Sequence, residues 1–330
     1  MKIIFSFIAI AFTTLGFAQQ GHSYSVVKTF HIASSGGWDY LVSHDKKLYV
    51  SHGTQVNILD ENSGDSVSFI PNTTGVHGIA FNDALNKGYT SNGRLNNVTV
   101  FDLTTFKVTG QIATGENPDA IMYEPFTKTI ITCNGRTNNL SVIDPVKEQV
   151  IATIPVGGKP ETAVSDEKGK LFVNIEDKNE IVEVDLKEFA VKNHWSLEGA
   201  EGPTGLAIDK STKRLFAGCD KKLVVLNADN GKVVTTVPIG DGCDGVAFSN
   251  AAKTIFTSNG EGTMSVIQEG ANDKFSLLGN VKTKRGARTI TMNEQTKTIY
   301  LPTADFDPVA KGPNGRPMMI PGTFQVLVVQ

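Results

Sequence analysis

The chain is poor in cysteine, has no surplus of positive charge and, beyond its first residues, has no long apolar run. Three cysteines in 330 residues are too few for a fold held together by disulfides. Lys and Arg number 31 against 34 Asp and Glu, so no basic excess is present to neutralise a phosphate backbone. Beyond the N-terminus the sequence contains no stretch of 18 consecutive apolar residues, so it predicts no internal membrane span.

Several sequence motifs of catalysis are also missing. The chain has no Gly-x-Ser-x-Gly elbow, no P-loop, no dinucleotide fingerprint and no Cys-x-x-Cys-His haem attachment. The sequence therefore assigns no enzyme class by motif, and it indicates no cofactor.

The first residues predict an export signal. Lys2 precedes the apolar run 3–12, and Gly16-Phe17-Ala18 ends the segment in a small-x-small pattern. This order is typical of a secretory signal peptide, so we expect cleavage after Ala18 and a periplasmic or extracellular location. The mature chain, residues 19–330, would form a single domain. The alternative is that residues 3–12 form a buried N-terminal strand.

What the chain does have is glycine, 32 residues of it, and a unit of about 40 residues that recurs. Each copy contains a short apolar run, a turn, an aromatic residue in a second run, an alternating strand and a final strand. No stretch has the apolar stripe of a helix. Four short strands in a unit of this length predict a blade of a β-propeller. The seven copies begin at Trp38, Val76, Pro118, Pro160, Pro203, Cys243 and Ala287.

Seven blades of four strands predict an all-β, seven-bladed propeller, but the last copy lacks its fourth strand. The chain ends in the alternating segment 324–329, which matches a third strand. The missing strand is found at the other end, where residues 26–32 resemble the fourth strand at 233–239. We therefore expect the N-terminal strand to complete the last blade, which closes the ring and leaves no long sheet edge.

At this point the repeats resemble those of the YVTN-type, or YncE-like, seven-bladed propellers. Tyr89-Thr90-Ser91-Asn92 and Phe256-Thr257-Ser258-Asn259 approximate the tetrapeptide that names the family, although no copy spells it in full. The resemblance covers nearly the whole mature chain. It implies the propeller fold, but it implies no single chemistry, because the family has none. Lactonase-type propellers are neighbours by the same resemblance.

The repeat predicts which residues meet at one end of the central channel, because the first strand of each blade begins there and the second strand ends there. The first-strand position is rich in ionisable groups: Asp39, His77, Asp119, Glu161, Thr204, Asp244 and Arg288. The second-strand position carries His52, Asn92, Asn134, Ile175, Cys219, Asn259 and Thr303. The polar members of both sets are candidate ligand-binding residues.

Carboxylates around a narrow channel repel one another, and a bound cation or pairing with Arg288 would relieve that repulsion. The alternative is a solvated channel mouth with no ligand. Asp119, Glu161 and the Asn amides would suit Ca²⁺ or Mg²⁺, whereas His52 and His77 would favour Zn²⁺ or other transition ions. The sequence does not choose between these ions or establish that a metal binds.

Two further features are predicted beside this end of the channel. The segment 304–322 carries four prolines and three glycines, which favours a long irregular loop that acts either as a lid or as simple surface packing. Cys219 and Cys243 belong to adjacent blades at this end. They would be either a disulfide or two buried thiols.

These patterns favour an exported propeller that binds a ligand or partner at its channel face without catalysis. The alternative is a lactonase-type hydrolase in which a metal or carboxylates activate water, with His77, Glu161 and Arg288 as base, acid and oxyanion partner in some order. DNA binding has been proposed within the family that the chain resembles. The excess of acidic over basic residues disfavours it here. We expect a monomer, and the sequence does not identify the ligand or partner.

Overall fold

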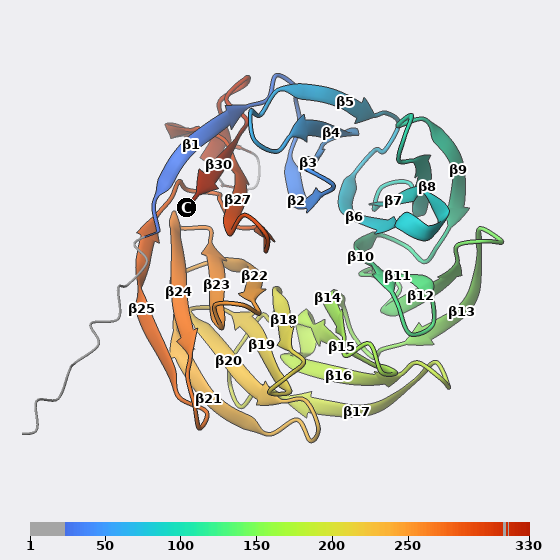
Figure 1. Ribbon diagram of the computed structural model, residues 1–330, viewed down its shortest axis with the longest axis vertical. Helices are drawn as coiled ribbons and strands as arrows, with labels where there is room; N and C mark the ends of the chain where they lie inside the picture. Colours follow the sequence, from blue (N-terminus) through green and yellow to red (C-terminus); the bar gives the residue numbers. More distant parts are fainter. Residues whose placement is uncertain (1–23, 313–314, 316) are drawn as a thin grey trace, which may run out of the picture.

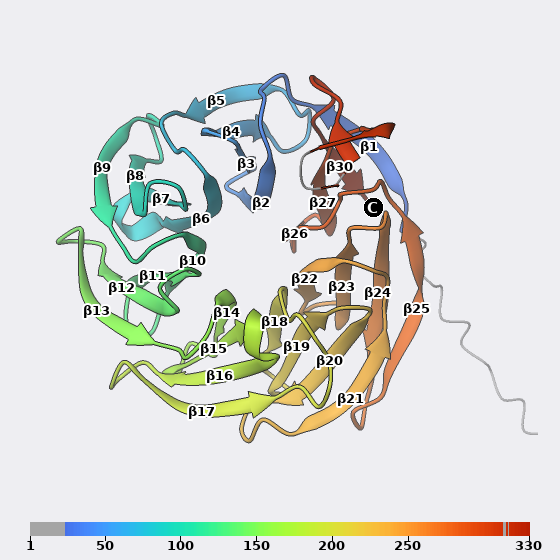
Figure 2. The same cartoon turned by 180° about the vertical axis from the view of Figure 1, so that it is seen from behind.

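A computed structural model describes residues 24–312, 315 and 317–330. The predicted signal segment lies outside these described residues. Seven four-stranded antiparallel sheets stand around a central channel (Figures 1 and 2). The predicted all-β, seven-bladed propeller is thus confirmed. Within the described ranges, no helix is long and apolar enough to cross a membrane.

Each blade runs from an inner to an outer strand, and blades 1 to 6 follow the chain order. Blade 1 contains β2 (Trp38–His44), β3 (Lys47–His52), β4 (Gln55–Asp60) and β5 (Ser66–Ile70). Blade 2 contains β6 (Val76–Asn82), β7 (Lys87–Asn92), β8 (Asn97–Asp102) and β9 (Val108–Ala113). Blade 3 contains β10 (Pro118–Glu124), β11 (Thr129–Asn134), β12 (Asn139–Asp144) and β13 (Gln149–Pro155).

The second half of the ring repeats this order. Blade 4 contains β14 (Pro160–Ser165), β15 (Lys170–Ile175), β16 (Glu180–Asp185) and β17 (Ala190–Ser196). Blade 5 contains β18 (Leu206–Asp209), β19 (Arg214–Cys219), β20 (Lys222–Asn227) and β21 (Val233–Pro238). Blade 6 contains β22 (Cys243–Ser249), β23 (Thr254–Asn259), β24 (Thr263–Glu269) and β25 (Phe275–Lys282). Two short 3-10 turns lie in connections between strands. The turn η1 (Asp83–Leu85) connects β6 to β7, and η2 (Glu176–Lys178) connects β15 to β16.

Blade 7 joins the two ends of the chain. Its strands are β26 (Thr291–Asn293), β27 (Thr298–Thr303), β30 (Gln325–Val329) and, outermost, β1 (Val26–His31). Strand β1 pairs antiparallel with β30, from Val26 opposite Val329 to His31 opposite Gln325. The predicted closure by the N-terminal strand is confirmed. It gives β30 a partner on its outer side, so the last blade has as many strands as the others.

The core lies between neighbouring blades and is built on the second strands. The aromatic residues predicted to share one register, Tyr49, Tyr89, Phe172, Phe216, Phe256 and Tyr300, are all buried. The third strands alternate in sequence, but their polar residues do not face water. Thr99, Ser141 and Ser265 are buried too, because a middle strand of a blade is covered on both faces by the adjacent blades.

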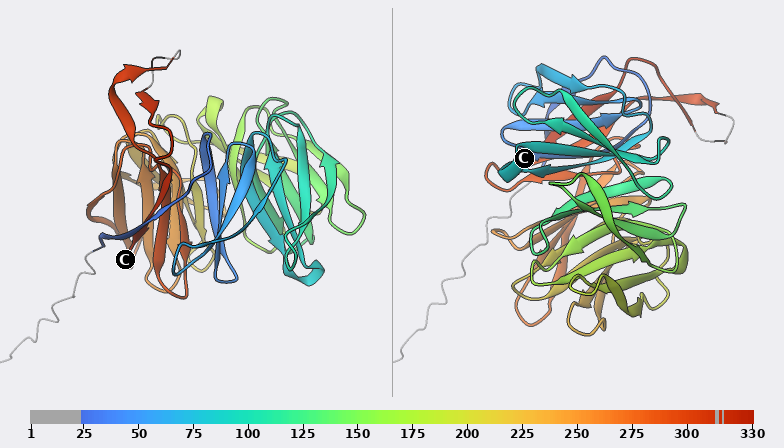
Figure 3. Two further views of the ribbon diagram at one scale, coloured as in Figure 1. Left: turned by 90° about the horizontal axis from the view of Figure 1, so that it is seen from above. Right: turned by 90° about the vertical axis from the view of Figure 1, so that its right-hand side faces the viewer.

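The segment predicted as an irregular loop contains a small hairpin instead. Strands β28 (Phe306–Lys311) and β29 (Pro317–Met319) pair antiparallel and project from one face of the ring (Figure 3). Prolines are tolerated because each strand of a two-stranded ribbon has an unpaired edge. At its base, the ring of Phe306 lies 6.1 Å from that of Trp38, so the hairpin stands beside the start of β2, as the sequence predicted for this segment.

Candidate binding site at the channel mouth

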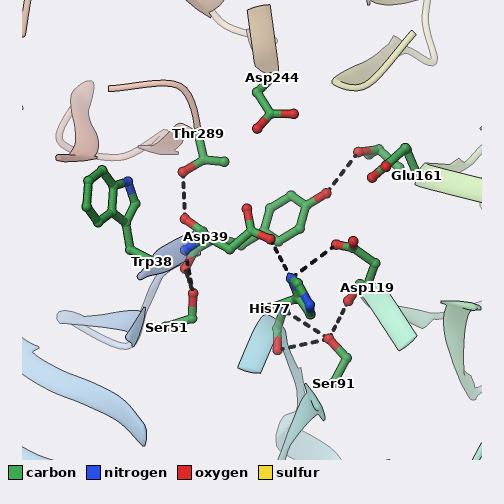
Figure 4. A network of polar contacts seen from close by, with 12 residues as sticks. Trp38, Asp39, Ser51, His77, Ser91, Asp119, Glu161, Asp244 and Thr289 are labelled. Carbon is green, nitrogen blue, oxygen red and sulfur yellow. Dashed lines mark hydrogen bonds and ion pairs between the residues drawn. The ribbon is translucent and has the colours of Figure 1, made fainter. Parts of the chain in front are cut away.

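A bulge at the start of most inner strands turns two consecutive side chains away from the ladder. In blade 1 the pairing register shifts between Trp38 and Leu41, and the same shift follows the first residue of β6, β10, β14 and β22. A bulge re-aims the side chains next to it. Asp39, His77, Asp119, Glu161 and Asp244 consequently converge around one end of the channel (Figure 4).

Hydrogen bonds between blades hold the backbone of this mouth in place. The Thr289 hydroxyl donates to the carbonyl of Asp39 in the next blade, at 2.6 Å, and the amide of Asp39 donates to Ser51 Oγ at 3.1 Å. The Ser91 hydroxyl likewise donates to the carbonyl of Asp119 across the blade boundary. Ser91 of the repeated tetrapeptide thus fixes the first strand of the neighbouring blade, whereas Ser51 binds the first strand of its own blade.

Asp39, His77 and Asp119 form the tightest polar cluster in the mouth. His77 Nδ1 lies 2.6 Å from Asp39 Oδ2 and 3.7 Å from Asp119 Oδ1. Burial works against protonation of His77, but the hydrogen bond to Asp39 and the charges of Asp119 and Asp39 outweigh it, so the pKa of His77 is raised. Burial, with the charge of Asp39, raises the pKa of Asp119 to about 7. Three successive blades thus supply one nitrogen and two oxygen donors to one point.

Arg288 joins the opposite side of the mouth to this cluster. Its Nε donates to Asp244 Oδ2 at 2.6 Å, and its Nη2 donates to the carbonyl of Trp38 at 3.1 Å and lies 3.5 Å from Asp39 Oδ1. Burial nevertheless raises the pKa of Asp244, against the effect of Arg288. The guanidinium therefore pairs with Asp39 and Asp244 at the same time.

Glu161 belongs to a second ionic group, with Lys159 and Glu176. The Lys159 ammonium contacts both carboxyl groups. Burial and the charge of Asp119 raise the pKa of Glu161 to about 9, whereas hydrogen bonds to Glu161 and Lys159 outweigh burial and lower the pKa of Glu176. Lys159 thus pairs with both carboxyl groups, and burial disfavours ionisation of Glu161 more than that of Glu176.

Tyr40 reaches from blade 1 across to blade 4. Its hydroxyl reaches Thr162 Oγ1 in blade 4, at 3.4 Å, and its pKa is raised well above the usual value by burial and by the surrounding carboxylates. The tyrosine side chain lines two recesses of about 160 and 220 Å³ whose other walls are mostly apolar. The residue after the ring position is small in every other blade: Gly78, Ala120, Thr162, Gly205, Gly245 and Thr289.

The small residues at this level follow from how closely the inner strands approach. A Cβ on Gly205 would lie 2.6 Å from the backbone nitrogen of Val246 in the next blade. A larger side chain at the position of Gly205 is therefore excluded by the neighbouring strand. Blade 1 is the only blade with a large side chain at the equivalent position, Tyr40, and this side chain lines both recesses.

The second-strand candidates do not share the mouth. Asn92, Asn134 and Asn259 are fully buried, and each amide donates to two side chains of its own blade, as Asn92 does to Asn97 and Thr99 at 2.8 and 2.9 Å. They tie the second strand to the third. Their hydrogen-bonding capacity is used inside the blade, so the candidate site rests on the first-strand residues.

The side chain of His52 also forms its contacts away from the mouth. Its ring stacks on Phe324 with centroids 3.8 Å apart, and its two nitrogens contact Ser34 Oγ at 2.5 Å and the carbonyl of Gly36 at 2.7 Å. Burial lowers its pKa. Of the two cysteines considered for a disulfide, Cys219 and Cys243, both are buried free thiols.

Sequence reasoning missed Tyr40, Lys159 and Glu176. Tyr40 had a signal, because it directly follows the ring position and is the only large residue at that level of the repeat. Lys159 and Glu176 lie in connections between strands, at positions where the copies differ. No repeat pattern would have selected them.

The chain matches no family model and no curated protein sequence. Among solved structures it is similar to hydrazine synthase of Kuenenia stuttgartiensis, with a TM-score of 0.72 over 87% of this chain and 96% of that chain, at 14% sequence identity. At this identity the likeness shows the fold alone. The chain is a seven-bladed β-propeller.

Proposed function

We propose that this protein is an exported propeller of the YVTN-type, YncE-like kind that binds a positively charged ligand, or a cationic group of a partner, at the channel mouth without catalysis. The observation that carries the proposal is a charge imbalance. Five carboxyl groups surround the mouth, and among the described residues there only Lys159 and Arg288 bring a permanent positive charge. Burial and mutual repulsion therefore raise the pKa values of Asp119, Glu161 and Asp244, and a further cation would favour their ionised forms. The carboxyl groups belong to Asp39, Asp119, Glu161, Glu176 and Asp244.

A cationic ligand group suits this environment for an electrostatic reason. Carboxylates that are withdrawn from water and crowded together repel one another, and an added cation offsets that repulsion. The backbone around them is fixed by bonds between blades, such as that from Thr289 to Asp39. A ring of acceptors that is already in position loses little freedom when a ligand binds, which favours affinity.

The export part of the proposal rests on the sequence of residues 1–18, which lie outside the described residues. Intact-mass analysis of protein recovered from the producing cells tests it. A mature chain that begins at Gln19 supports export, and a chain that retains Lys2 and the apolar run contradicts it.

A lactone hydrolase is the second candidate, and one observation favours it. Asp39 holds the His77 imidazole by its Nδ1 while Asp119 faces the same nitrogen, a His–carboxylate arrangement suited to moving a proton to or from water. A screen of aliphatic and aromatic lactones tests this role. Hydrolysis that is lost in His77→Ala would replace binding with catalysis as the function.

The binding proposal is tested with primary amines, diamines, guanidines and quaternary ammonium compounds, each with a neutral analogue of the same shape. Calorimetry should find binding for cations only. Asp244→Asn should weaken that binding at least tenfold, and Arg288→Ala, which removes a competing cation, should strengthen it. Lys107→Ala and Lys147→Ala, at exposed outer positions, serve as controls. Equal binding of the neutral analogues, or an effect of the controls equal to that of Asp244→Asn, would contradict the proposal.

A further inference from the structure

We propose that Asp39, His77 and Asp119 form a binding site for a divalent transition-metal ion. Among the described residues, these three each offer one ligand atom, and the three atoms lie within 4.8 Å of one another. This inference rests on the proposed function, because the metal ion would be the cation that binds at the same mouth.

The separations of the three donors are close to those around a single small ion, and one of them is shorter. His77 Nδ1 is 2.6 Å from Asp39 Oδ2 and 3.7 Å from Asp119 Oδ1. Zn²⁺ binds such atoms at about 2.0–2.2 Å, so ligand atoms that share an ion lie about 3 to 4 Å apart. Small rotations of the Asp39 and His77 side chains about their χ torsions would open the shorter contact.

The three ligands are also held in position before any ion arrives. They stand at one repeat position on three adjacent inner strands, β2, β6 and β10. Ser91 accepts from the amide of Gly78, next to His77, and donates to the carbonyl of Asp119. Thr289 fixes the carbonyl of Asp39. Such support from neighbouring groups orients ligands and strengthens metal sites.

The division of contacts at Asp39 and the exposure of the cluster leave coordination positions open to an ion. Arg288 lies 3.5 Å from the Asp39 oxygen that His77 does not contact, so one oxygen of Asp39 pairs with the guanidinium and the other stays available to an ion. The side chains of His77, Asp39 and Asp119 are 26, 16 and 12% exposed. Water or a ligand group therefore has access to the remaining coordination positions from the channel.

The donor set indicates which ions would bind. One imidazole nitrogen and two carboxylates suit Zn²⁺, Mn²⁺ or Fe²⁺, whereas Ca²⁺ takes six to eight oxygen ligands. Three protein ligands with open positions resemble the ligand number of zinc sites that also hold water or a substrate. We therefore expect Zn²⁺ to bind and Ca²⁺ not to displace it.

The test uses the untagged protein, stripped with chelator and titrated with Zn²⁺ by calorimetry, with elemental analysis after dialysis. We expect one Zn²⁺ per chain, and at least tenfold weaker binding in both His77→Gln and Asp119→Asn. His194→Gln is the matched control, because His194 lies 2.7 Å from Glu180 on the outer surface and forms a His–carboxylate pair outside the mouth. Thermal unfolding of each variant shows that it is folded.

Three results would overturn the metal site: no binding tighter than about 100 μM, unchanged binding in both mouth variants, or an equal loss in His194→Gln. Its failure is distinguishable from that of the proposed function. If organic cations bind the metal-free protein and Asp244→Asn weakens them, the binding function stands and the metal site falls. If Zn²⁺ binds as expected and no organic cation does, the metal site stands and the organic cationic ligand falls.

Discussion

The His77 imidazole and the Asp39 carboxylate lie 2.6 Å apart although 38 residues separate them in the chain. The two residues occupy the same repeat position in adjacent blades, so the pair exists only when β2 and β6 stand side by side. It is a contact between blades at the channel mouth. The charge state of the mouth therefore depends on the packing of the blades.

This pair makes a prediction about the histidine. Asp39→Asn replaces the charged acceptor with a neutral one of the same shape, so the pKa of His77 should fall, because burial then faces less opposition. NMR titration of the His77 ring in wild type and variant measures the change. The exposed His194 serves as an internal reference. An unchanged His77 titration would show that Asp39 does not control its protonation.

Glu161 predicts how stability depends on pH. Its pKa is raised from 4.5 to about 9, so between these values the folded protein keeps a proton that the unfolded chain has released. Because the folded state binds more protons there, the free energy of unfolding falls as pH rises through this window. Glu161→Gln keeps a neutral side chain at every pH and should reduce that fall.

The measurement is the melting temperature from pH 5 to pH 9. Each kcal/mol changes the melting temperature by about 2–4 °C in a domain of 150–250 residues and by less in a larger one, so wild type should lose more of its melting temperature than Glu161→Gln over this range. Glu188→Gln, at an exposed outer position, is the control. Parallel curves for wild type and Glu161→Gln would show that Glu161 ionises normally in the folded protein.

Much of the fold was predictable because a repeat shows its periodicity directly. Tyr49, Tyr89 and Phe256 recur at a fixed place in the unit, and each proved to be a buried residue between blades. The closing strand was predictable for the same reason, since seven blades require a strand that the C-terminal end does not supply. These inferences needed only the spacing of residues along the chain.

The site was less predictable. The repeat places a residue at one end of the channel, but it does not say whether the side chain faces the mouth or forms hydrogen bonds within its own blade. Asp119 and Asn134 both belong to that end by register. A bulge turns Asp119 into the mouth, whereas Asn134 is consumed by hydrogen bonds to Asn139 and Ser141 within its blade. Such a choice depends on local backbone geometry and on satisfying buried polar groups, which spacing alone does not encode.

The closure of the ring can be tested on one side chain of β1. Phe30 is buried and packs in a cluster with Tyr300 and Phe324, so Phe30→Ala should lower the free energy of unfolding by about 3–5 kcal/mol. Val27→Ala in the same strand removes a side chain that is 54% exposed and should cost much less. Urea unfolding measures both. A cost for Phe30→Ala no larger than that for Val27→Ala would argue against the closing role of β1.

The charge balance predicts that the protein does not bind duplex DNA tightly. The formal charge of −3 becomes −4 if Lys2 is removed with the predicted signal segment. A surface without a basic surplus releases few counterions on contact with phosphates, so affinity has no electrostatic source. Fluorescence anisotropy at physiological salt should find no sub-micromolar binding. A sub-micromolar affinity that weakens steeply with added salt would revive the nucleic-acid hypothesis.

Tyr40 offers a test of how the two recesses are separated. Its ring lines both recesses, of about 160 and 220 Å³, so Tyr40→Ala should join them into one larger apolar space. The substitution should cost at most about 3 kcal/mol, because the side chain is only partly buried. Tyr40→Phe keeps the ring and gives up only the long 3.4 Å contact with Thr162, so its stability should stay close to that of wild type.

The fluorescence of an apolar dye that brightens on burial reports the new space. Brightening with Tyr40→Ala but not with Tyr40→Phe is the expected result, and equal fluorescence in the two variants would mean that another group separates the two recesses.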